Sequence, residues 1–163
     1  MKCRALQWLV LAVFFAPVAS WTVGAEPEGK EPKKDAVKND LEKLEGTWTL
    51  VSRESKGMKT PDGVLKNWQL TIKGDQWTVK YPAGVDKATI QIDPKKDPKT
   101  IDFTFKHPTG GKILTRGIYA LASTTDGDTL TLCRVDQRGR PRPKEFKTTR
   151  SAGILFVWKR AGK

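Results

Sequence analysis

The sequence predicts an all-β protein, an eight-stranded antiparallel up-and-down barrel preceded by a short N-terminal helix. Two observations support this prediction. From Gly46 onward, apolar residues recur at every second position in eight segments, which is the period of a half-buried strand. The loops between these segments are mostly short, which suits an antiparallel meander better than helical crossovers. Closing the eight strands into a barrel buries the apolar face and removes exposed edges, with an open sandwich as the alternative.

Residues 1–25 have the pattern of a secretory signal peptide. Lys2 and Arg4 precede an apolar run from Trp8 to Ala16, and small residues end the segment at Val23-Gly24-Ala25. A cut after Ser20 also fits. An uncleaved membrane anchor is the alternative, but the apolar run is about half of the roughly 20 residues that a span needs. The protein is therefore expected to be exported to the periplasm or beyond, and to meet a membrane only if this segment stays uncleaved.

Residues 26–40 predict a disordered linker, because they are rich in Lys, Glu and Pro and almost without large apolar side chains. Val37, Leu41 and Leu44 recur at helical spacing, and they predict a short amphipathic helix between residues 36 and 45. The barrel domain is assigned to residues 41–163.

The eight strand-like segments pair in sequence order. Residues 47–53 open the sheet and residues 154–160 close it. Tight turns or turn-forming stretches join the remaining segments into three predicted hairpins, which cover residues 68–81, 88–106 and 113–132.

Six aromatic side chains fall on the inward register of these segments: Trp68, Trp77, Tyr81, Phe103, Phe156 and Trp158. Their burial contributes on the order of 10 kcal/mol before entropy is counted, so the core is sufficient without disulfides. They are also the candidate lining of a ligand site in the barrel interior or at its mouth. The alternative is that they simply fill the barrel.

A Gly-x-Trp motif, Gly46-Thr47-Trp48, lies on the first predicted strand, and Arg160 ends the last one. This arrangement resembles a lipocalin. The resemblance implies that Trp48 closes one end of the barrel and that Arg160 packs across it. Strand alternation independently directs Arg160 inward, where its guanidinium needs an aromatic face or carbonyl partners.

More narrowly, residues 41–160 resemble an uncharacterised family of exported lipocalin-like bacterial domains, best known from planctomycetes. The matching stretches are residues 44–52, 72–75, 98–102, 117–119, 127–133, 143–146 and 159–160. The resemblance implies fold and export but no activity. The chain lacks the disulfides of ordinary lipocalins and a helix after the last strand, which argues against a large ligand cavity.

No catalytic group can be assembled from these residues, so the protein is not expected to be an enzyme. His107 is the only histidine and lies in a loop rich in Pro and Gly, which favours a solvated turn residue over a lone general base. Cys133 loses its only potential partner with Cys3, and it is expected to be a small residue in the sheet rather than a reactive thiol.

No cofactor and no metal site are expected either. Three carboxylates flank one loop, at Asp93, Asp97 and Asp102, but Lys95, Lys96 and Lys99 lie among them. Calcium loops place several oxygens together without interleaved ammonium groups, so solvated turn charges are favoured.

The charge distribution points to anionic partners. The formal net charge is +12, and ten basic residues against two acidic ones lie between residues 129 and 163. Within this region a loop alternates arginine with Gly or Pro, which predicts a stiff arm suited to phosphate, sulfate or carboxylate, with a solvated loop as the alternative. Its candidate anion-binding residues are Arg138, Arg140, Arg142 and Lys144.

Two functions remain open at this point. The first is an exported binding module that holds a small hydrophobic molecule in or at the mouth of the barrel. The second is a filled barrel that docks through the arginine loop on an anionic glycan, on another anionic envelope surface or on an acidic protein. Nucleic acid is not expected as a partner of an exported chain.

Overall fold

The computed structural model describes residues 32–135, 140–149 and 153–162. In chain order, its helices and strands are α1 (Pro32–Leu44), β1 (Gly46–Ser55), β2 (Met58–Lys59), α2 (Asp62–Leu65), β3 (Gln69–Lys73), β4 (Gln76–Tyr81), β5 (Gly84–Asp93), β6 (Thr100–Lys106), β7 (Lys112–Thr124), β8 (Gly127–Arg134) and β9 (Ile154–Arg160).

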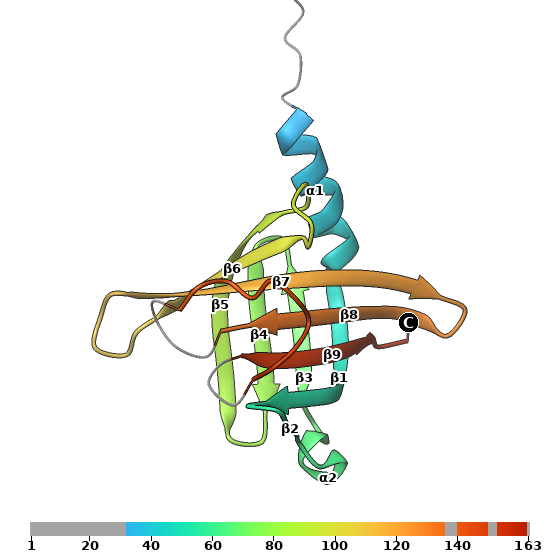
Figure 1. The fold of residues 1–163 in the computed structure, drawn as a ribbon, viewed down its shortest axis with the longest axis vertical. Coiled ribbons are helices and arrows are strands. Elements are labelled where there is room, and N and C mark those ends of the chain that lie inside the picture. Colours follow the sequence, from blue (N-terminus) through green and yellow to red (C-terminus); the bar gives the residue numbers. More distant parts are fainter. Residues whose placement is uncertain (1–31, 136–139, 150–152, 163) are drawn as a thin grey trace, which may run out of the picture.

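Eight of the strands form a closed antiparallel barrel (Figure 1). Each strand pairs with the next in the order β1, β3, β4 and so on to β9, and β9 pairs back with β1. The closing register runs from Trp48 opposite Arg160 to Ser55 opposite Ile154. The predicted fold class is therefore confirmed.

The core lies inside the barrel, at the alternate positions that the sequence pattern marks. On β3 and β4, for example, Leu70, Ile72, Trp77 and Val79 are buried while the residues between them are half-buried or exposed. β2 and α2 were not predicted. They form the connection between β1 and β3, and Leu65 of α2 is buried in the core. Neither element is long enough to show a period in the sequence.

α1 begins at Pro32, so the expected linker is wrong for residues 32–40, which are helical. Proline is well tolerated in the first turn of a helix because its missing N–H would have no partner there. The remaining residues of the predicted linker and the predicted signal peptide lie outside the described residues. Figure 1 shows α1 leading directly into β1 at one end of the barrel.

Candidate functional site

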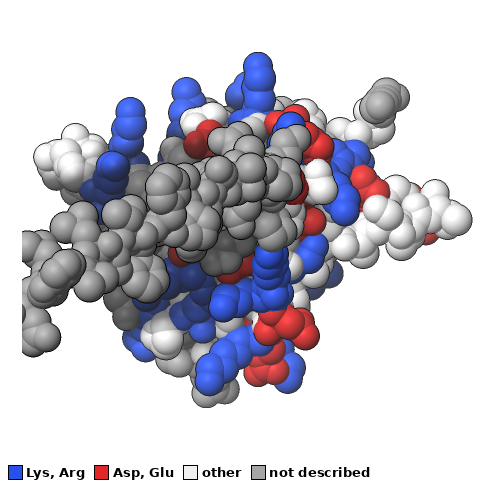
Figure 2. All heavy atoms as spheres, turned by 90° about the horizontal axis from the view of Figure 1, so that it is seen from above, with Lys and Arg blue, Asp and Glu red and all other residues white. Residues whose placement is uncertain are grey.

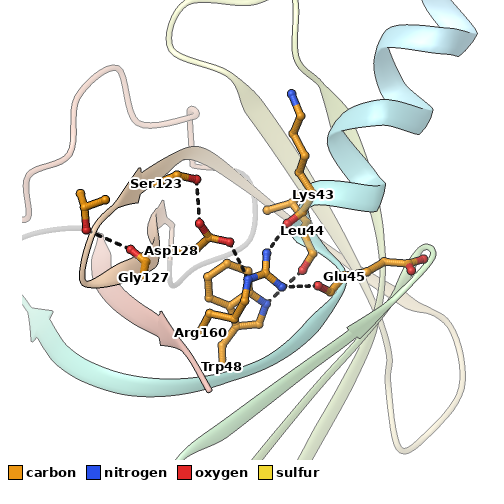
Figure 3. A network of polar contacts seen from close by, with 9 residues as sticks. Lys43, Leu44, Glu45, Trp48, Ser123, Gly127, Asp128 and Arg160 are labelled. Atoms are coloured by element: carbon orange, nitrogen blue, oxygen red, sulfur yellow. Dashed lines mark hydrogen bonds and ion pairs between the residues drawn. The ribbon is translucent and has the colours of Figure 1, made fainter. Parts of the chain in front are cut away.

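Trp48 and Arg160 close the end of the barrel next to α1 (Figure 3). The Trp48 side chain is fully buried, and its indole Nε1 donates a hydrogen bond of 3.0 Å to the carbonyl of Leu44. The central guanidinium carbon of Arg160 lies 4.1 Å from the centroid of the Trp48 ring. The structure thus brings together the two residues that the lipocalin resemblance singled out.

The Arg160 guanidinium also joins α1 to the barrel. Its two terminal nitrogens donate hydrogen bonds of 2.5 Å to the carbonyls of Lys43 and Glu45, at the C-terminal end of the helix. A cation is favourable there because the helix dipole leaves partial negative charge on the last carbonyls. Nε donates to Asp128 at 2.7 Å. Hydrogen bonds from Ser123 and then from Arg160 lower the pKa of Asp128.

A second contact between α1 and the barrel was missed at the sequence level. The carboxylate of Asp40 accepts hydrogen bonds of 2.7 Å from Lys99 Nζ and from the hydroxyl of Tyr119. Burial acts to raise the pKa of Asp40, but these hydrogen bonds outweigh it and the pKa is lowered. Burial and the bond to Asp40 raise the pKa of Tyr119. The signal was the position of Asp40, three residues after Val37 and therefore on the apolar face of the helix.

The six predicted lining residues pack mainly against one another. Trp77 meets Phe103 edge to face with 5.1 Å between ring centroids, Phe156 stacks on Trp158 at 6.0 Å, and Trp68 stacks on Tyr81 at 4.8 Å.

The cavity left near these rings has a volume of about 30 Å³, whereas ligand pockets typically measure about 300–1,000 Å³. The predicted interior site for a whole small molecule is therefore wrong for the described part of the chain. The aromatic side chains fill the barrel instead.

The opposite end of the barrel, its mouth, holds two arginines that sequence reasoning did not select. Arg134 follows Leu130 and Leu132 on the inward face of β8, and its guanidinium lies 5.6–5.9 Å from the ring centroids of three phenylalanines, Phe103, Phe105 and Phe156. Arg53 pairs with Phe156 across β1 and β9, and its guanidinium lies 5.9 Å from the same ring. Arg134 could have been found from its strand register, as Arg160 was.

The described part of the predicted arginine arm does not project from the barrel. Residues 140–149 run across the outside of the barrel (Figure 1), and Arg142 forms an ion pair of 2.7 Å with Asp102. Arg142 also donates to the carbonyls of Ile101 and Gly117.

Arg142 therefore has a structural role, and its assignment as an anion-binding residue stays a prediction. Arg140 and Lys144 are exposed, and Arg138 lies outside the described residues.

Residues 140–149 also contact Cys133 on the outer side of β8. Its thiol is buried and donates a weak hydrogen bond of 3.5 Å to the carbonyl of Lys147. Burial, reinforced by the charge of Glu54, raises the pKa of the thiol to about 11. Thr148 ties the segment further to β1, because its hydroxyl donates to Glu54 and accepts from the backbone N–H of Gly57.

The other polar candidates have local partners. His107 Nδ1 lies 2.7 Å from the hydroxyl of Thr109 within its own turn. Asp93 accepts a bond from the backbone N–H of Lys95, and Asp102 is paired with Arg142. Among the described residues, no group of three or more His, Cys, Asp or Glu side chains is placed to hold a metal ion.

A hollow of about 780 Å³ is an open depression outside the barrel, between α1 and the connection that follows β5. It is lined by both signs of charge: Lys95, Lys96 and Arg142 together with Asp93 and Asp102. Viewed from the α1 end, acidic side chains are likewise interspersed with basic ones (Figure 2). The described side chains that are visible at this end therefore carry both signs of charge.

A different distribution occurs on the outer faces of β5, β6 and β7 near the mouth. Lys106 lies directly opposite Lys112, and the register that pairs Ala88 with Phe105 brings Lys87 beside Lys106. We call Lys87, Lys106 and Lys112 the lysine row. All three side chains are exposed, and within the described residues none has a carboxylate at ion-pair distance.

Comparisons of the chain with models of protein families, with curated proteins and with solved structures find no match. No helix in the described part of the chain is long and apolar enough to cross a membrane. The closed eight-stranded barrel fits a lipocalin-like binding fold.

Replacing Gly46 with Ala should destabilise the protein by about 3 kcal/mol, measured by urea unfolding. Gly46 has a φ of +127°, and an added Cβ would lie 2.7 Å from Arg160 Nη1. The control is Gly63→Ala in α2, where nothing lies within 4 Å of the added Cβ. Equal unfolding free energies for the two variants would contradict the close packing at the closed end.

Cys133 should react with a disulfide reagent at pH 8 at least 100-fold more slowly in the folded protein than in urea. The reason is that its thiol is both buried and protonated at this pH. The reaction can be followed by absorbance, with a single-cysteine unfolded peptide as the reference. A folded-state rate close to that of the peptide would show that residues 140–149 do not cover this thiol.

Proposed function

We propose that the protein is an exported binding protein with a filled barrel, and that it attaches to an anionic polysaccharide through the lysine row. The observation that carries this proposal is the side-by-side placement of three exposed ammonium groups, with no carboxylate paired to them among the described residues. The filled interior supports a role for the outer surface.

The lysine row does not stabilise the barrel by itself. Like charges directly opposite each other on a sheet, such as Lys106 and Lys112, oppose folding by a few tenths of a kcal/mol up to about 1 kcal/mol. A bound polyanion removes this repulsion. Lys80 adds a fourth exposed charge nearby, because it pairs with Val85 two residues before Lys87.

The geometry suits a linear polymer. Adjacent strands lie about 4.8 Å apart, so a chain that crosses β5, β6 and β7 meets one ammonium group per strand. Lysines carry point charges on flexible stems and can follow irregularly spaced carboxylate or sulfate groups. An anionic polysaccharide is also the polyanion expected in the compartment that the N-terminal sequence predicts. We do not include Arg142 in this surface, because it already forms an ion pair with Asp102.

Replacing all three residues of the lysine row with Ser should abolish retention on a heparin column at 150 mM salt, while the wild type elutes well above that concentration. The control variant replaces Lys66, Lys73 and Lys159, which are exposed but do not lie side by side. It removes the same net charge and should elute close to the wild type. Circular dichroism checks the fold of both variants.

Two results would overturn the proposal. One is an equal loss of retention in the two triple variants, which would mean that only net charge matters. The other is tight binding to vesicles that contain anionic lipid, without retention on heparin, which would identify a membrane surface as the partner.

A further inference from the structure

We propose that the hollow between α1 and the connection that follows β5 binds a small zwitterion with an apolar body, that is, an amino acid or a dipeptide with apolar side chains. Its volume of about 780 Å³ lies within the range of small-molecule sites, about 300–1,000 Å³. Figure 1 shows α1 and this connection next to each other at the closed end of the barrel. The site is therefore separate from the lysine row, which lies near the mouth.

The hollow presents both signs of charge without neutralising them. Its described lining includes Asp93, Lys95 and Lys96, and within the described residues none of the three has an oppositely charged side chain at ion-pair distance. The other two charges of the lining, on Arg142 and Asp102, already pair with each other at 2.7 Å. A ligand with one ammonium and one carboxylate group can pair with both kinds of side chain, whereas a ligand of a single charge can pair with only one kind.

The remaining lining suits the body of such a ligand. Val37 of α1, Ile92 at the end of β5 and Pro94 of the connection supply apolar surface. Ile92 is buried, and Val37 and Pro94 are half-buried, so a ligand that covers them removes further apolar surface from water. Gln91 and Thr100 add an amide and a hydroxyl that can bond to a peptide group.

The walls of the hollow are already held in place. The hydrogen bonds of Asp40 to Lys99 and Tyr119 fix α1 against the barrel. Asp93 Oδ1 accepts a hydrogen bond of 3.1 Å from the backbone N–H of Lys95, which fixes the start of the connection. The second carboxylate oxygen of Asp93 has no hydrogen-bond partner in the described part of the chain. A site whose walls are preformed binds its ligand with little cost of ordering.

The proposal is tested by titrating the full mature protein at about pH 6.5 with the dipeptide phenylalanylleucine, with heat as the readout. Both ends of this dipeptide are charged at that pH. Three control ligands each lack one feature: the N-acetylated dipeptide lacks the ammonium group, the C-terminal amide lacks the carboxylate, and glycylglycine lacks the apolar side chains.

The dipeptide is expected to bind at one site per chain, at least threefold more tightly than each control ligand. The factor is modest because Lys95 and Lys96 are exposed and ion pairs in contact with solvent are weak. Free phenylalanine, titrated in parallel, distinguishes the two sources of this chemistry, since the tighter of the two ligands identifies the class that the site takes.

Two variants localise the charges. Asp93→Asn keeps an oxygen that can accept from the backbone N–H of Lys95 but removes the charge, so the dipeptide and its N-acetylated form should bind equally to it. The double variant Lys95→Gln/Lys96→Gln should bind the dipeptide and its amide equally. Each variant should keep the preference that depends on the other charge.

The matched controls change the same residue types elsewhere. Asp126→Asn and the double variant Lys66→Gln/Lys159→Gln alter exposed side chains outside the described lining of the hollow. Both should bind all ligands like the wild type. The variant without the lysine row should also bind the dipeptide normally, so failure of this site and failure of polysaccharide binding are distinguishable.

Three results would overturn the proposal. One is the absence of binding by both phenylalanylleucine and phenylalanine. Another is an affinity of any control ligand for the wild type equal to that of the dipeptide, a comparison that stays decisive even if a variant fails to fold. The third is unchanged ligand preference in both folded variants of the hollow.

Discussion

The stacking of Arg160 on Trp48 is the interaction on which the rest of the structure depends. Closing the barrel requires the first and last strands to pair and their shared end to be covered. Arg160 serves both needs, because it lies opposite Trp48 in the closing register and donates to the last carbonyls of α1. Its charge is tolerated because an indole face, two carbonyls and Asp128 surround it.

The chain uses arginine and lysine for different purposes. Arg53, Arg134, Arg142 and Arg160 are half-buried and lie against rings, carbonyls or a carboxylate, where a planar group with five donors can satisfy several partners at once. Every described lysine side chain except Lys99 is exposed. These four arginines therefore stabilise the barrel, whereas the lysines face solvent together with the exposed Arg116 and Arg140.

Much of the fold could be predicted from period-two hydrophobicity, because each strand has one buried face. The positions of Trp48 and Arg160 could be predicted from the strand register and the Gly-x-Trp motif together. The course of residues 140–149 was not, since it depends on Asp102 and the carbonyls of Ile101 and Gly117, which are distant in sequence. The contacts of Asp40 could not be predicted for a similar reason, because its partners Lys99 and Tyr119 are distant in sequence. Whether the aromatic residues fill or line the barrel depends on how their volumes fit together, and the period-two pattern carries no information on this fit.

The most direct test of this account is a double-mutant cycle between Trp48→Leu and Arg160→Met, with unfolding free energy as the readout. If the stacking holds the closed end together, the two substitutions should be coupled by at least about 1 kcal/mol, because either one alone already removes the shared interaction. Additive effects, with a coupling within about 0.3 kcal/mol of zero, would contradict the central role assigned to this pair.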